Sequence, residues 1–131
     1  DEPTISIPVI GKVAAGEPIL AQENIEDYFS IGESFFSQSD LKNDTFVLKV
    51  QGESMINAGI NNGDYIFIRY APDIPNGKWG MFNVSGYSVI ARRLGNRIIA
   101  VDGKGFELSD RNKKVSPYGR ITAIYKIRKN R

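Results

Sequence analysis

Short β-rich runs, separated by turn-forming residues, are the feature that most narrows the folds open to this chain. Helical periodicity is scarce, and Gly, Asn, Asp and Pro divide the sequence at short intervals, which is typical of an all-β domain. Pro3 and Pro8 also bias the residues before them away from helix. The pattern therefore predicts extended chain at residues 5–13 and strands at residues 46–50, 65–70, 79–84, 87–94, 97–101 and 121–127.

Three dipeptides are well suited to connect these strands tightly. Asn62-Gly63 leads into the run at 65–70, and Ser85-Gly86 and Gly95-Asn96 each lie between two consecutive runs, as hairpin turns do. Short helical turns are expected only at 33–36 and 54–58. We therefore expect a mostly-β, mostly antiparallel and partly barrel-like domain with one or two short helical turns. It should span residues 11–131, and residues 1–10 should form a linker arm before it.

The composition excludes several kinds of site. The 131 residues, about one domain by length, contain neither cysteine nor histidine, so a Ser-His-Asp triad, a disulfide and a Cys- or His-ligated metal are impossible within the chain. We expect no cofactor and no metal. A net charge of +2 is too small to indicate that this segment binds nucleic acid, and it contains no helix-turn-helix pattern. No apolar run approaches the ~20 residues that span a bilayer, and no signal pattern opens the chain, so we expect a soluble, cytoplasmic protein without membrane partners.

Ser54 is the candidate nucleophile. It follows the strand expected at 46–50, and Gly52 allows the chain to turn sharply before it. If Glu53, Ser54 and Met55 begin a helical turn, the amides that follow converge on one point, as stabilisation of an oxyanion requires. The other interpretation of this segment alone is that Ser54 caps a short helix, which serine does well.

Two motifs in order resemble those of the LexA-type serine self-peptidases, a family that includes phage repressors and UmuD-like mutagenesis proteins. Residues 52–55 and 59–64, Gly-Glu-Ser-Met and Gly-Ile-Asn-Asn-Gly-Asp, resemble its nucleophile region. Residues 11–18, Gly-Lys-Val-Ala-Ala-Gly-Glu-Pro, resemble the segment that it cleaves in its own chain. The resemblance covers almost the whole chain and fades after about Asp102. It implies a scissile bond between Ala15 and Gly16 and a nucleophile at Ser54.

The lysine that serves as general base in this family is missing. The family pattern is close to Val-x-Val-Lys-Arg-Leu, and residues 89–94 are Val-Ile-Ala-Arg-Arg-Leu. Counting back from Leu94 puts Arg92 at the lysine position, and strand alternation puts it on one face with Ile90. A shifted alignment puts Ala91 there, which would fit a deliberate lysine-to-alanine change. An arginine stays protonated and cannot be a base, so this form should be inactive; Lys49 and Lys78 are the nearest other amines.

The resemblance also implies an assembly and partners. We expect the C-terminal self-cleavage and dimerisation domain of a LexA-like repressor of the DNA-damage (SOS) response. Such a protein is a homodimer, is cut when it meets RecA–single-strand-DNA filaments, and binds operator DNA through an N-terminal domain that this chain does not contain. The run at 121–127 could pair across a two-fold axis as an edge strand. The alternative is a non-catalytic dimerisation domain of a phage-type or stress-response repressor; a signal-peptidase-like enzyme would need a membrane anchor.

Overall fold

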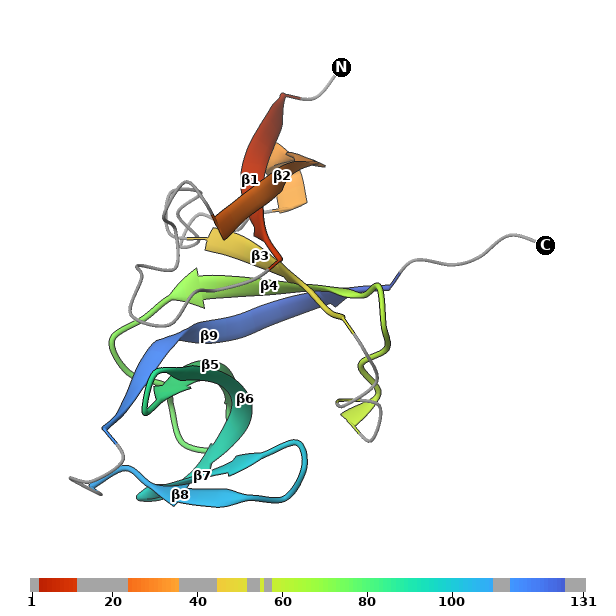
Figure 1. Ribbon diagram of the computed structural model, residues 1–131. Coiled ribbons are helices and arrows are strands. Elements are labelled where there is room, and N and C mark those ends of the chain that lie inside the picture. The colour runs from red at the N-terminus through yellow and green to blue at the C-terminus, as the bar shows by residue number, and fades with distance from the viewer. Residues whose placement is uncertain are drawn as a thin grey trace.

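The described strands form one open, mixed sheet (Figure 1). The computed structural model describes residues 3–11, 24–35, 45–51, 55, 58–109 and 114–126. The sheet order is β2-β1-β3-β4-β9-β5-β6-β7-β8, and β1 and β3 are parallel while the other neighbours are antiparallel. The strands are β1 Thr4–Ile10, β2 Ile25–Gly32, β3 Thr45–Lys49, β4 Tyr65–Tyr70, β5 Trp79–Val84, β6 Tyr87–Leu94, β7 Arg97–Ala100, β8 Gly105–Glu107 and β9 Val115–Tyr125.

The predicted mostly-β class is confirmed, and the local signals located most strands closely. The bounds of β4, β5 and β6 are those expected, β7 ends one residue earlier than expected, and β3 begins and ends one residue earlier. Ser85 and Gly86 both have positive φ, 52° and 89°, in the turn between β5 and β6, as a two-residue hairpin turn requires. The helical turn expected at 33–36 is the short 3-10 helix Glu33–Phe35. The turn expected at 54–58 lies largely outside the described residues.

Two strands and half of a third were not predicted. β2 has many exposed and charged positions and is an edge strand held by β1, and β8 has only three residues. In β9, Pro117 and Gly119 would normally interrupt a strand. Here Phe82 pairs with Pro117 and Met81 with Gly119, so Tyr118 is an extra residue at an irregularity in the ladder. A Cβ on Gly119 would lie 2.4 Å from the Arg69 carbonyl oxygen, and glycine is therefore needed there.

The prediction that residues 121–127 form an edge strand is wrong with respect to the order of strands in the sheet. β9 lies between β4 and β5. However, the two neighbours pair with different parts of it, because the β5 pairs end at Arg120 while the β4 pairs run from Gly119 to Tyr125. In the described part of the chain, residues 121–125 thus have a strand partner on one side only. The physical reason is that β5 begins at Trp79, next to the Gly80 that pairs with Arg120, so it has no further strand residues to pair with the rest of β9.

Residues 1–10, expected to be a linker arm, contribute the strand β1 to the interior of the sheet. Ile7 and Ile10 are fully buried, and Val9 is 3% exposed. β1 pairs with β2 along its whole length and with β3 at Val9 and Ile10. The domain boundary expected after residue 10 stays a prediction.

The core lies on both faces of the sheet because strand residues alternate between them. Ile66 and Ile68 of β4 point into a cluster that also contains Ile10, Phe46 and Ile90. Phe67, between them, points to the opposite face with Ile7, Val9 and Val47. A third cluster lies among β5, β6, β7 and Ile74. Among the described residues, no helix is long and apolar enough to cross a membrane.

Candidate functional site

The sequence-predicted site residues divide into two groups. Ala15, Gly16, Gly52, Glu53 and Ser54 lie outside the described residues. Three others are described, namely Met55, Ala91 and Arg92. The site is therefore built from these three and from the residues that flank the predicted nucleophile.

The described residues on either side of Ser54 are held by backbone hydrogen bonds. The amide of Val50 donates to the Asp64 carbonyl at 2.9 Å, and the amide of Gly63 donates to the Val50 carbonyl at 2.9 Å. The Met55 carbonyl accepts from the amides of Ala58 and Ile60, at 3.1 and 3.2 Å. The chain thus returns at residues 63–64 to the point where it left at Val50, and the predicted nucleophile belongs to the segment closed in this way.

Asp64 ties that segment to the end of β9. Its buried carboxylate accepts hydrogen bonds from the Asn61 amide and from Lys126 Nζ, both at 2.8 Å on Oδ2. Lys126 Nζ also donates to the Gly59 carbonyl. Burial alone would raise the pKa of Asp64, but the two hydrogen bonds and the charge of Lys126 outweigh it, so the pKa lies below its ordinary value. No local sequence pattern indicates this contact, because the two residues are 62 positions apart in the chain.

Ala91 and Arg92 lie on opposite faces of β6. Ala91 is fully buried and packs with Ile74, Phe82, Val84 and Ile98. Arg92 is exposed, pairs with Trp79 of β5, and donates from Nε to the Gly77 carbonyl at 3.0 Å. Arg92 lies on the same face of β6 as Ile90. Ile90 belongs to a core cluster against which Met55 also packs.

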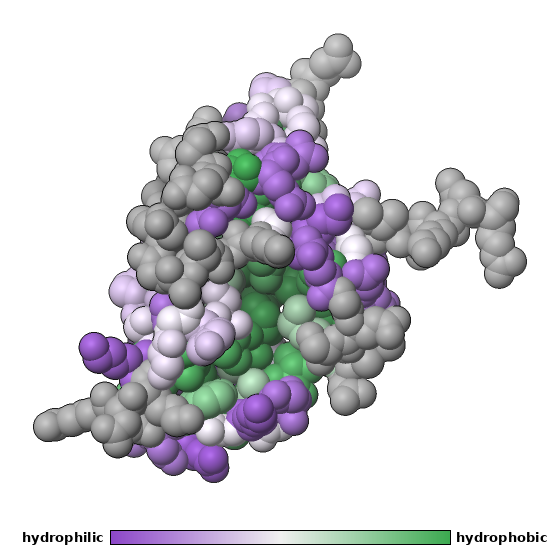
Figure 2. Space-filling view, in the orientation of Figure 1, coloured by the Kyte–Doolittle hydropathy of each residue, from purple (hydrophilic) through white to green (hydrophobic). Residues whose placement is uncertain are grey.

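Two cavities connect the Arg92 face of β6 with the residues that follow Ser54. One, of about 290 Å³, is lined by Met55, Ile90 and Val101 among others. The second, of about 270 Å³, is lined by Ala58, Trp79, Arg92, Leu94 and neighbours from β7. Figure 2 shows hydrophobic residues gathered in a hollow near the middle of the face drawn. The two cavities share Ala100 and Val101 in their linings, so the structure brings Arg92 close to Met55 and Ala58, whereas Ala91 lies in the core.

The model of the "Peptidase S24-like" family matches residues 8–123. The chain belongs to the peptidase S24-like family. The matched range extends past Asp102, where the resemblance seen in the motifs fades, and it includes the segment around Ser54 and both candidate positions for the base. The similarity to LexA-type self-peptidases that the motifs indicated is confirmed.

Curated relatives of this S24-like chain are named LexA repressor. One from Syntrophomonas wolfei is 48% identical over 83 residues, which are 60% of this chain and 39% of the relative. Another from Geobacillus sp. strain WCH70 is 51% identical over 73 residues, 56% of this chain and 34% of the relative. A third from Staphylococcus epidermidis is 51% identical over 76 residues, 58% and 36% of the two chains. This chain thus spans well under half the length of the relatives that it matches.

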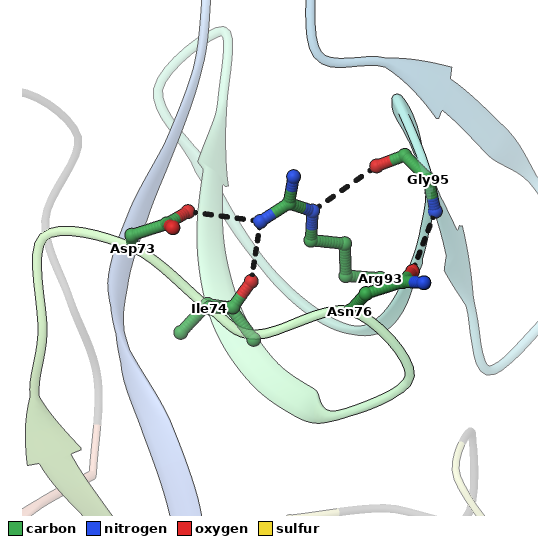
Figure 3. A network of polar contacts seen from close by, with 5 residues as sticks. All are labelled: Asp73, Ile74, Asn76, Arg93 and Gly95. Carbon is green, nitrogen blue, oxygen red and sulfur yellow. Dashed lines mark hydrogen bonds and ion pairs between the residues drawn. The ribbon is translucent and has the colours of Figure 1, made fainter.

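A further group of residues in this S24-like domain fastens a loop to the end of β6 (Figure 3). Arg93 Nη1 donates to the Ile74 carbonyl at 2.7 Å and to Asp73 Oδ1 at 3.1 Å, and its Nε donates to the Gly95 carbonyl at 3.0 Å. The Gly95 amide donates to Asn76 Oδ1 at 2.7 Å. Since Gly77 holds Arg92, both arginines are anchored on the same loop. Sequence reasoning missed this loop, although its Asp-Ile-Pro-Asn-Gly run is typical of a turn.

Proposed function

We propose that this S24-like domain is the C-terminal self-cleavage and dimerisation domain of a LexA-like repressor. In it, Ser54 is the nucleophile and the Ala15–Gly16 bond of the same chain is the substrate. The observation that most strongly supports this proposal is that Arg92 and Ala58, which follows Ser54 in the sequence, line the same cavity. This shared cavity supports the assignment, because a general base must lie within reach of the nucleophile and Ala58 follows Ser54 by only four residues in the sequence.

Position 92 is a better candidate for the base than position 91. Ala91 is fully buried among apolar side chains on the opposite face, so a lysine there would overfill the core and point away from Met55. Among the alternative amines, Lys49 alternates onto the face of Val47, again away from the Met55 cluster. Lys78 lines a cavity with Ala58 and Ile60, but its side chain is exposed to solvent, whereas a lysine that acts as a base needs a buried site.

The chain with Arg92 is accordingly a form with little or no self-cleavage. A guanidinium remains charged across the pH range in which the protein is folded, and a positioned base contributes about 10²–10⁴-fold to such a rate. The Nε of Arg92 is also engaged with the Gly77 carbonyl. This engagement favours the second candidate function, a non-catalytic dimerisation domain of a phage-type or stress-response repressor, in which Arg92 has a structural role.

Restoring lysine tests the proposal. Incubated at alkaline pH, the chain with Arg92 should stay whole, and Arg92→Lys should give two fragments that separate between Ala15 and Gly16, as judged by mass spectrometry. Ser54→Ala added to Arg92→Lys should abolish the cut, and Ala91→Lys, the matched control on the opposite face, should not produce it. Cleavage by Ala91→Lys alone would reassign the base, and ready cleavage of the chain with Arg92 would refute the argument from the missing base.

The homodimer belongs to the same proposal. Residues 121–125 of β9 pair on one side only among the described strands, and Ile124, one of these residues, is 41% exposed. A second copy could add its own β9 there and cover this apolar surface. We further propose that a separate N-terminal domain binds operator DNA, that RecA filaments trigger cleavage in the SOS response, and that the protein is cytoplasmic. These parts of the proposal are supported by the family match and by the names of the relatives.

A further inference from the structure

The predicted scissile bond lies between two strands that remain paired with each other. β1 ends at Ile10 and β2 begins at Ile25, and these two residues are partners in the sheet. The Ala15–Gly16 bond falls in the stretch of sequence between them. Residues 1–10 therefore have one covalent connection to the rest of the chain, after Ile10, and all their other contacts are noncovalent.

Those noncovalent contacts are extensive. β1 has a β2 partner at each of its seven positions, from Thr4 with Gly32 to Ile10 with Ile25. On its other side, Val9 and Ile10 pair with β3. The ladder continues at the Pro3 carbonyl, which accepts from the Glu33 amide at 2.9 Å. β1 is thus held by β2 along its whole length and by β3 at its last two residues, as a strand is when it adds to an existing sheet.

The side chains of β1 anchor it on both faces of the sheet. Ile7 and Val9 pack with Val47 and Phe67 on one face, whereas Ile10 packs with the cluster on the opposite face. Ser6, next to Ile7, is exposed. The slot between β2 and β3 therefore selects an extended peptide with apolar residues at the positions of Ile7, Val9 and Ile10.

We propose that this slot is a peptide-binding site that keeps the N-terminal segment bound after the chain is cut between β1 and β2. The ligand is the chain's own segment that contains residues 4–10, held by backbone hydrogen bonds and by three buried aliphatic side chains. When the cut is the self-cleavage at Ala15–Gly16, which rests on the proposed function, breaking the peptide bond does not separate the two parts. Their separation is a second step, the release of β1 from the sheet.

A cut made by an added enzyme tests this without self-cleavage. A recognition sequence for a site-specific protease is inserted between Ala15 and Gly16 of the full chain, and the chain is cut at about ten micromolar and passed over a size-exclusion column. Both fragments should elute together with the size of the uncut chain and separate only in denaturant. Separate elution under native conditions would overturn the proposal. Because Ser54 takes no part in this cut, a chain that never cleaves itself gives the same test.

Peptide exchange measures the selectivity of the slot. The cut complex is incubated with a fluorescent peptide of residues 1–15, and unlabelled peptides compete for the slot while anisotropy is followed. A peptide with Ile7→Ala should compete about 30-fold or more weaker than the unchanged peptide, whereas Ser6→Ala, the matched control, should compete within about twofold of it. The substitutions are in the peptide, so the folding of the body does not change. Equal competition by both variants, or failure of the labelled peptide to enter the cut complex, would contradict the proposal.

Discussion

The Asp64 side chain links the residues that follow the predicted nucleophile to Lys126, just after β9. Its carboxylate is buried and accepts from the Asn61 amide and from Lys126. A buried carboxylate is tolerated because these donors replace the water that it loses. The folded state therefore favours the ionised form, and the pKa of Asp64 is lowered from its ordinary value of 3.8.

Replacing Asp64 by asparagine should destabilise the protein at neutral pH. Asp64→Asn removes the charge that Lys126 pairs with, and we expect a loss of about 1–3 kcal/mol in the free energy of unfolding, measured by urea titration at pH 7. Because the folded pKa is the lower one, the stabilisation by Asp64 is present above about pH 4 and is lost as the pH falls through the folded pKa. The difference between the two proteins should shrink correspondingly in acid.

The control for Asp64 is a carboxylate with a similar partner at the surface. Asp73 pairs with Arg93, but its side chain is 81% exposed, and exposed ion pairs contribute about 0–1 kcal/mol. Asp73→Asn should therefore change the free energy of unfolding less than Asp64→Asn does. Equal effects of the two substitutions would mean that burial of Asp64 is not what makes its contacts matter.

At the scale of elements, three successive side chains of β6 point to different parts of the molecule. Ala91 enters the core, Arg92 faces the cavity side, and Arg93 reaches back to the loop at residues 73–76 (Figure 3). The backbone adds to this fastening, since the Gly77 amide donates to the Arg93 carbonyl at 2.8 Å. The position of the loop that holds Arg92 thus depends on Arg93.

Replacing Arg93 by methionine should loosen that loop. The Arg93→Met side chain keeps apolar length but loses three hydrogen bonds to carbonyl and carboxylate oxygens, and we expect a loss of about 1–3 kcal/mol. Amide hydrogen exchange should accelerate at residues 73–78. Arg97→Met, which removes a half-exposed ion pair with Glu107, should cost about 1 kcal/mol or less. Unchanged exchange in Arg93→Met would show that the backbone contacts alone fix the loop.

At the scale of the whole molecule, the described sheet is open and leaves several strand edges, among them β2, β8 and the last part of β9. An edge strand presents unpaired backbone groups that another strand can bind. Of these edges, residues 121–125 lie next to a cavity of about 520 Å³ lined by Trp79, Ile121 and Ile124. Trp79 is 36% exposed. Apolar surface therefore coincides here with a stretch of β9 that pairs on one side only among the described strands.

The dimer proposal predicts a mass of about twice 14.6 kDa in sedimentation at micromolar concentration. Ile124→Glu places a charge in the apolar part of the proposed interface and should weaken dimerisation at least about 10-fold. Tyr87→Glu, at a residue that is 75% exposed beside the β5–β6 turn, should leave the mass unchanged. A monomer at high concentration for the unchanged protein would remove the dimer, and equal effects of the two substitutions would move the interface elsewhere.

Local sequence signals correctly predicted the strands in which buried and exposed residues alternate between turn residues. β4, β5 and β6 combine alternating burial with turn residues at their ends, and backbone sterics at residues such as Gly86 act over a few residues only. The same alternation put Ala91 and Arg92 on opposite faces. The family, too, was accessible from short motifs, because residues 11–18, 52–55 and 59–64 resemble its landmarks in the same order.

Packing between segments that are distant in the sequence determined the other features of the fold and of the candidate site. Alternation cannot tell which face of β6 meets Met55, and no local pattern places β1 between β2 and β3 or joins Asp64 to Lys126. β9 continues through Pro117 and Gly119 although both normally interrupt strands, because β4 and β5 supply the hydrogen bonds and the close approach at Arg69 demands a glycine. Such contacts form only when burial of apolar surface outweighs the entropy of closing long loops, and that balance is a property of the whole fold.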